Sequence, residues 1–156
     1  MELVFVALVL VVLVTAVLPS FRRTWMGVEA ERTAFDVAQL LRAGRVLAVN
    51  QAESVDWVWD ETGHVYCVRK AGDTCAAEPI TSDRLGRIHT VPTDVVLTAI
   101  RDGTATDRIR FFPNGTAQDA TVTVGDQTRT RQEITVRGVT GYIDIKSAGA
   151  SATPPS

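Results

Sequence analysis

Two cysteines are the residues most able to form a covalent link in this chain. Cys67 and Cys75 are separated by seven residues that include Gly72, Asp73 and Thr74, which are turn-forming types. In an oxidising compartment the two thiols can close this loop as a disulfide, which would stabilise the fold by about 2–3 kcal/mol. In a reducing cytosol they would remain ordinary thiols, so the predicted disulfide depends on export.

The sequence lacks the side-chain groupings that metal binding and catalysis need. His64 and His89 are the only histidines, and neither has an acidic or cysteine ligand at metal-binding spacing. No nucleophile elbow, phosphate-binding loop or pair of catalytic carboxylates is present. Asp56, Asp60 and Glu61 lie at alternate positions of a predicted strand and in the turn after it, which is typical of a solvated face. We therefore predict no enzyme activity, no metal site and no cofactor.

Three arginines near the C-terminal end are the remaining candidates for a binding function. Arg129, Arg131 and Arg137 form a modest basic group, and two of them occupy alternate positions of one predicted strand. The chain as a whole has a formal net charge of −2 and a pI near 5.7. This balance argues against a protein built chiefly to bind nucleic acid.

An apolar run at the start of the chain indicates that the protein is associated with a membrane. Residues 3–18 carry no charge and one hydroxyl, directly after Met1 and Glu2. At about 1.5 Å per residue the run gives roughly 24 Å of helix, short of the roughly 30 Å hydrocarbon core of a bilayer. The run is therefore a shortened membrane span, a signal-peptide core, or a span whose first turn precedes Met1.

The charges around this run do not settle its orientation. A secretory signal peptide needs a basic leading segment, which Met1 and Glu2 do not supply, although residues 14–16 (VTA) resemble a weak cleavage site. Arg22 and Arg23 follow the run, and taken alone they would hold the rest of the chain in the cytoplasm. A basic leader upstream of Met1 would remove both conflicts.

A second helical segment follows Pro19 and runs to about Asn50. Its small and apolar residues recur at spacings of four and three, which places them on one face of a helix. They are Ala30, Ala34, Val37, Leu41, Gly44 and Ala48. Because proline bends a helix without necessarily ending it, we predict one long helix with Pro19 as its bend and this stripe packed on a flat sheet.

The hydrophobic period then changes to the two-residue repeat of strands. Val55, Trp57 and Trp59 share one face of the first strand, and the tryptophans are predicted to bury against the helical stripe. Further strands are predicted at 64–68, near 87–90, and at 95–100, 108–112, 121–124, 129–136 and 142–145. At residues 113–115 (PNG) a β-turn is favoured over use of Asn114 as a glycosylation site.

These elements predict an α+β fold, in which a long N-terminal helix packs on an antiparallel β-sheet domain. The length suits one compact domain after the apolar run. We assign residues 1–20 to a membrane-embedded half of the helix and 21–50 to its amphipathic half. Residues 51–146 are the β-rich domain, and residues 147–156, rich in Ser, Ala, Gly and Pro, are a predicted disordered tail.

The start of the chain resembles the N-terminal helix of type IV pilin-like proteins. In that family a basic leader is removed, a glutamate follows within a few residues, and an apolar run then leads to a proline. Matching Pro19 to the family proline places Glu2 on the family glutamate without a gap. The resemblance implies that this sequence begins inside the mature helix, and that a prepilin peptidase would act on the full-length leader.

Three further segments are similar to the GspH/FimT subgroup of this family. Residues 40–48 (LLRAGRVLA) resemble its helix segment, and residues 109–116 (IRFFPNGT) resemble its F-x-P-x-G hairpin. Residues 132–136 with 140–143 are similar to its C-terminal strand pair. The resemblance extends from Glu2 to about Ile145.

The resemblance implies a structural subunit of a fibre. One role is a minor pseudopilin of a type II secretion system, which supports protein export; the alternative is a FimT-like minor pilin of a type IV pilus, acting in pilus assembly or DNA uptake. Such proteins span the inner membrane once, with the C-terminal domain in the periplasm. They join a periplasmic fibre by helix bundling with other pseudopilins or minor pilins.

Two residues would act in that assembly. Glu2 and Pro19 match the family positions, and the implied partner of the Glu2 carboxylate is the free α-amine of a neighbouring subunit, since an unpaired carboxylate near lipid is costly. An ordinary interfacial position for Glu2 is the alternative. Some FimT-type pilins bind DNA through arginines near the C-terminal strand pair, where this chain has Tyr142 and Asp144.

Overall fold

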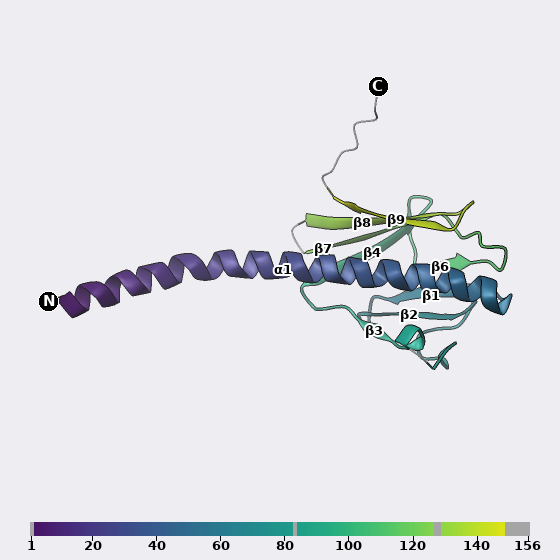
Figure 1. Ribbon diagram of the computed structural model, residues 1–156, viewed down its shortest axis with the longest axis horizontal. Coiled ribbons are helices and arrows are strands. Elements are labelled where there is room, and N and C mark those ends of the chain that lie inside the picture. The colour runs from purple at the N-terminus through teal and green to yellow at the C-terminus, as the bar shows by residue number, and fades with distance from the viewer. Residues whose placement is uncertain (1, 83, 127–128, 149–156) are drawn as a thin grey trace, which may run out of the picture.

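One 50-residue helix, α1 (Glu2–Gln51), runs the length of the molecule and continues through Pro19. The computed structural model describes residues 2–82, 84–126 and 129–148, and it leaves the side chains of residues 2–5 and 7–27 undescribed. Figure 1 shows the N-terminal half of α1 projecting away from the strands, while its C-terminal half lies along them. The predicted single long helix is confirmed.

Two antiparallel sheets follow the helix, and together they form what we call the β domain (residues 55–147). The four-stranded sheet has the order β3-β2-β1-β6, with β1 (Val55–Asp60), β2 (Val65–Lys70), β3 (His89–Thr90) and β6 (Arg108–Phe111). The five-stranded sheet has the order β5-β4-β7-β8-β9, with β4 (Val95–Arg101), β5 (Thr104–Ala105), β7 (Ala120–Asp126), β8 (Arg129–Arg137) and β9 (Tyr142–Ser147). A short 3₁₀ helix, η1 (Arg84–Gly86), precedes β3.

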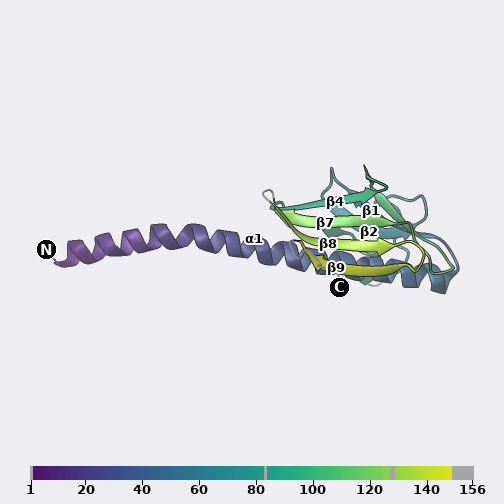
Figure 2. The same ribbon diagram turned by 90° about the horizontal axis from the view of Figure 1, so that it is seen from above.

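The predicted α+β class is confirmed, since α1 packs on antiparallel strands of both sheets. Figure 2 shows β9 beside α1, with β8, β7 and β4 following in order. The division into two sheets was not predicted. It arises because β6 pairs with β1, whereas β7 pairs with β4, so consecutive strands 6 and 7 join different sheets.

The small-residue stripe of α1 forms the helical side of the core. All six of its members are buried: Ala30, Ala34, Val37, Leu41, Gly44 and Ala48. Close approach is visible at Gly44, where an added Cβ would lie 3.3 Å from the Phe111 ring on β6. Trp57 and Trp59 belong to the same core cluster, so their predicted burial is confirmed.

The first strand departs from its predicted pattern. Alternation predicted one solvated face for β1, but Asp56 on that face is 0% exposed and Val58 is also buried. The expectation that Asp56 belongs to a solvated face is therefore wrong. The loop after β2 covers this face, where Val58 packs with Cys67 and Cys75 in a second, smaller cluster.

The C-terminal end of the chain extends further into the sheet than predicted. β9 continues to Ser147, which the sequence had placed in the tail, and pairs there with Gln132 of β8. Ala148 follows in a turn, and the rest of that predicted tail, residues 149–156, lies outside the described residues.

Replacing Ala34 by leucine should destabilise the β domain, because the buried Ala34 leaves no room for a larger side chain. Overpacking of this kind costs about 1–3 kcal/mol. Gln39→Leu adds the same side chain at an exposed position of α1 and should change the free energy of unfolding by less than about 0.5 kcal/mol. Urea unfolding of the detergent-solubilised variants measures both values, and equal stabilities would contradict the proposed tight packing.

Candidate functional site

The three segments that resemble the GspH/FimT subgroup meet at the C-terminal end of α1. Arg42 donates from Nη2 to the Ile143 carbonyl at 3.3 Å, and Arg45 donates from Nε to the Gly115 carbonyl at 3.0 Å. Gly141 lies between them with a φ of +60°, and a Cβ there would clash with the Gly115 carbonyl oxygen and lie 2.6 Å from the Arg45 Nε. Two helix arginines therefore hold strand β9 and the turn after β6 against α1.

The turn after β6 is shaped by its own side chains. Asn114 Oδ1 accepts hydrogen bonds from the Thr116 backbone N–H at 3.1 Å and from the Thr116 hydroxyl at 2.7 Å. The Gly115 N–H donates to the Phe112 carbonyl at 2.9 Å, and Gly115 has a φ of +82°. The predicted β-turn is confirmed, and the side-chain oxygen of Asn114 accepts hydrogen bonds within it.

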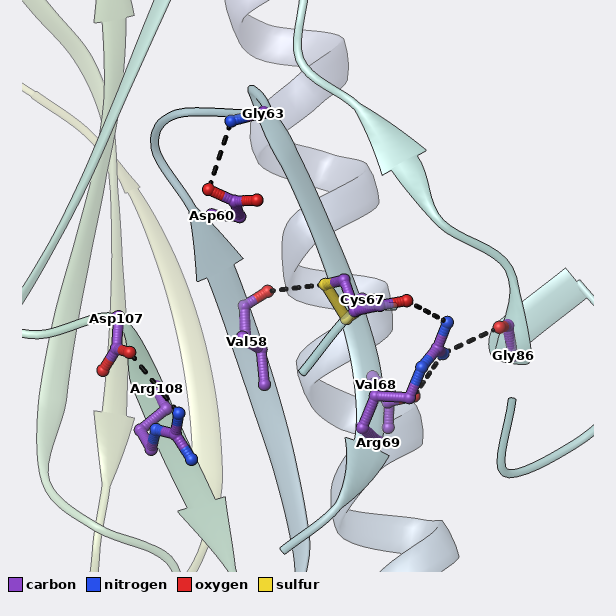
Figure 3. Close-up of a disulfide and its surroundings, with 10 residues drawn as sticks. Val58, Asp60, Gly63, Cys67, Val68, Arg69, Gly86, Asp107 and Arg108 are labelled. Atoms are coloured by element: carbon purple, nitrogen blue, oxygen red, sulfur yellow. Dashed lines mark hydrogen bonds and ion pairs between the residues drawn. A yellow bond between two sulfur atoms is a disulfide. The ribbon is translucent and has the colours of Figure 1, made fainter. Parts of the chain in front are cut away.

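A disulfide joins Cys67 of β2 to Cys75 in the following loop, as predicted. The two Cα atoms are 5.7 Å apart and both residues are buried. Figure 3 shows the bond lying against Val58 of β1. The disulfide therefore fastens the loop over the face of the four-stranded sheet that points away from α1.

Arg69 is a buried cation that ties the same loop together. Its guanidinium donates to the carbonyls of Val68 at 2.8 Å, Gly86 at 2.9 Å and Cys75 at 3.1 Å. Burial lowers the pKa of Arg69, with the Asp73 carboxylate partly opposing that shift. By these bonds Arg69 links β2 to the disulfide loop and to η1 (Figure 3).

Asp56 is the centre of a charge cluster on this outer face. Its carboxylate accepts from Arg110 Nε at 2.7 Å and from Arg110 Nη2 at 2.8 Å, a two-pronged pairing that fixes both groups. The Gly72 N–H donates to it at 2.9 Å, and the Arg108 guanidinium lies 3.6 Å away. The hydrogen bond from Arg110 to Asp56 is the main cause that raises the pKa of Arg110.

A third group of polar residues lies between α1 and β3. His89 stacks on Tyr66 with ring centroids 5.3 Å apart, and burial, followed by the Asp36 carboxylate, raises the pKa of Tyr66 to about 12. His64 lies in the turn before β2, with a φ of 49°. Across the described residues, no group of three or more histidine, cysteine or carboxylate side chains is arranged to hold a metal ion.

The predicted assembly residues lie on the projecting part of α1. The backbones of Glu2 and Pro19 are helical, and their side chains fall outside the described part of the structure. Where side chains are described, no helix combines the length and the hydropathy needed to cross a bilayer.

Farther along, α1 carries apolar residues on the face that points away from the β domain. Val28, Phe35 and Val46 are exposed by 52% to 59%. At about 100° per residue, Val28, Phe35 and Val46 fall within about 20° of one another around the helix. We call these three residues the outer helix face.

The candidate DNA-binding arginines are spread along β8. Arg129 is its first residue, Arg131 its third and Arg137 its last, so the end positions lie roughly 26 Å apart at about 3.3 Å per residue. The side chains of Arg129 and Arg131 are outside the described part of the structure. Arg137 is exposed and pairs across the sheet with Tyr142.

Sequence reasoning missed most of the polar contacts that hold the β domain together. Asp56 and Arg110 become partners only because β1 pairs with β6 in a register that sets them opposite each other. Nothing in the sequence around Arg69 indicated that its side chain would be buried. Arg42 and Arg45 were visible as part of the similar helix segment, but their acceptors lie 101 and 70 positions away.

The projecting helix and the two antiparallel sheets packed against it define a pilin-like protein. The sequence profile of the family described as Type II transport protein GspH matches residues 33–141, so this chain belongs to that family of structural pseudopilin and pilin subunits. No curated protein matches the chain.

Solved structures of similar fold include both kinds of subunit. The minor pseudopilin EpsH of the type 2 secretion system of Vibrio cholerae superposes with a TM-score of 0.66 at 12% identity, covering 79% of this chain and 99% of that one. The type IV minor pilin FimU of Pseudomonas aeruginosa gives 0.57 at 21% identity, with 74% and 91% covered. GspH of E. coli gives 0.58 at 12% identity, with 81% and 93% covered.

Removing the disulfide should weaken the β domain without rearranging it. The double variant Cys67→Ala, Cys75→Ala is expected to lose about 2–3 kcal/mol, because the unfolded chain regains the entropy of the open loop. Urea unfolding measures the loss, and the unaltered chain in reducing agent is the matched control. Complete alkylation of both thiols in the unreduced, denatured chain would contradict the bond.

Asp56→Asn should destabilise the chain far more than loss of an exposed carboxylate. The variant leaves Arg110 without its buried counter-charge, at a cost of about 2–4 kcal/mol, moderated because Arg110 keeps some contact with solvent. Asp107→Asn removes an exposed partner of Arg108 and should cost less than about 1 kcal/mol. Urea unfolding at neutral pH compares the two variants, and similar losses would refute a structural role for the buried pair.

Proposed function

We propose that the chain is a structural minor pseudopilin subunit of a type II secretion pseudopilus, which supports protein export across the outer membrane. Membership of the GspH family and similarity of fold to EpsH support this role. The chain acts by assembly and carries out no catalysis in this proposal, so it needs no cofactor.

The observation that carries the proposal is the outer helix face. Exposed apolar side chains are normal singly, but Val28, Phe35 and Val46 recur along one line of α1. Such a line on a helix is suited to packing against other helices. Bundling with the helices of other pseudopilins would cover it and would continue the contact made by the apolar run of residues 3–18.

The proposed location is the inner membrane, spanned once, with the β domain in the periplasm. The apolar run favours lipid contact, and the disulfide favours an oxidising compartment. In this arrangement residues 1–20 are the membrane half of the helix, 21–50 its amphipathic half and 51–146 the periplasmic domain. If the full-length protein carries a leader, a prepilin peptidase would process it before the subunit enters the fibre.

Glu2 is the residue that we propose to guide assembly. A carboxylate at the membrane end of α1 is stabilised by a cationic partner, and the α-amine of a neighbouring subunit supplies that charge. Pro19 would set the course of the helix between its membrane and amphipathic halves.

A type IV minor pilin is the second candidate, and the similarity of fold to FimU supports it. DNA uptake would then involve the basic residues of β8. Arg137 is exposed beside Tyr142, but the exposed Glu133 lies between Arg137 and the other two arginines on the same strand. The acidic pI favours the structural role over DNA binding.

Glu2→Ala should leave the chain folded and membrane-bound but block its incorporation into fibres, because the proposed charge pair is lost. Cell fractionation and immunoblotting of sheared fibres, in the cells that naturally produce the chain, measure the two outcomes separately. Glu31→Ala removes an exposed carboxylate from the other half of α1 and should incorporate normally. Unchanged incorporation of Glu2→Ala would defeat the proposed role of this residue.

Deleting the gene should reduce protein export while surface pili remain. The proposed pseudopilus acts in export, so the culture medium of the deletion strain should lose secreted proteins, and the reintroduced gene should restore them. Lost pili with normal export would instead favour the type IV role. If the detergent-solubilised chain shifts the electrophoretic mobility of duplex DNA in a salt-dependent manner, this would support a type IV minor pilin that acts in DNA uptake.

A further inference from the structure

A groove opens on the side of the β domain that faces away from α1. It has a volume of about 470 Å³ and lies between the end of β1, the disulfide loop and the turn from β5 to β6. Its lining includes Val58, Cys75, Ala76 and Ala105, which provide apolar contact surface. We call it the disulfide groove. Figure 3 shows Val58 between the disulfide on one side and Asp107 with Arg108 on the other.

The groove is bordered mainly by negative charge. Asp60, Glu61 and Asp107 are exposed carboxylates in its lining, and Arg108 is the one cation among the lining residues that the structure describes. The Arg108 guanidinium lies 3.6 Å from Asp56 and 3.5 Å from Asp107, so the lining holds three carboxylates against one cation. A cationic group entering the groove would therefore find an excess of carboxylates.

The walls of the groove are held in place before any partner arrives. The disulfide fixes one wall, and the pairing of Asp56 with Arg110 fixes β6 against β1 beneath it. On the rim, Asp60 Oδ1 accepts hydrogen bonds from the N–H groups of Thr62 at 3.0 Å and Gly63 at 3.1 Å. A preformed site costs less ordering on binding than a mobile one.

We propose that the disulfide groove docks a lysine- or arginine-bearing segment of another protein. The aliphatic part of such a side chain would lie over Val58 and Ala105, and its charged end would meet Glu61 and Asp107. Long basic side chains suit this arrangement because they combine an apolar stem with a charged tip. The groove lies opposite the outer helix face, so this partner binds independently of the helix contacts in the proposed fibre.

Site-specific photo-crosslinking in the cells that naturally produce the chain tests this proposal. The full chain carries Ala105→p-benzoylphenylalanine, an exposed position in the groove, or Thr98→p-benzoylphenylalanine, an exposed control on the outer face of β4. Mass spectrometry then identifies the crosslinked segment. We expect position 105, and not position 98, to capture a segment of a different protein that bears lysine or arginine at the crosslink.

Charge reversal shows whether the carboxylates provide the attraction. Glu61→Lys with Asp107→Lys should lower the crosslink yield about tenfold, which corresponds to about 1.4 kcal/mol. Glu61→Lys alone leaves the contact of Asp107 with Arg108 intact and should give a smaller loss. Glu133→Lys, an exposed charge reversal on β8, should leave the yield unchanged.

Four results would overturn the proposal. They are no crosslink at position 105, a crosslink to a second copy of this chain, capture of a segment without basic residues, and equal yields for Glu61→Lys and Glu133→Lys. Fibre incorporation of the Glu61→Lys variant is measured in the same cells. Normal incorporation with a lost crosslink would separate the groove partner from the assembly of the fibre.

Discussion

The close approach of α1 to the two sheets is the contact on which the β domain depends. Alanine and glycine in the small-residue stripe let the helix lie near the strands, and core side chains such as Trp57, Phe111 and Leu41 are fully buried there. The helix also covers β9, an edge strand, whose Ile143 carbonyl accepts from Arg42. The helix thus supplies core contacts through its buried face and, through Arg42, protects a strand edge that could otherwise pair with another chain.

Polar contacts fix the positions of loops and surfaces that apolar packing alone does not fix. Hydrophobic contact is non-directional, so it brings α1 onto the sheets without fixing the loops at their ends. Arg45 bonded to Gly115 fixes one such loop, and Asp56 paired with Arg110 fixes the outer face of the four-stranded sheet. These directional bonds and the disulfide give a defined shape to the surface on the side opposite the helix. That surface includes the proposed docking groove.

The two surfaces of the molecule suit different contacts. The outer helix face is a narrow apolar line on a rod, which favours parallel contact with similar rods. The disulfide groove is concave, partly apolar and bordered by carboxylates, which favours one short basic segment. Because they lie on opposite sides of the β domain, a subunit can join a bundle and still present the groove.

Short patterns in the amino-acid sequence were enough to predict the elements whose signals are local. Spacings of four and three along α1 predicted its buried face, alternation predicted β1, and the PNG segment predicted the turn at Asn114, because each pattern reflects one element meeting one environment. The division into two sheets, the burial of Asp56 and its pairing with Arg110 became visible only in the folded chain. Those depend on which distant strands pair and in which register, and no short stretch of sequence specifies that choice.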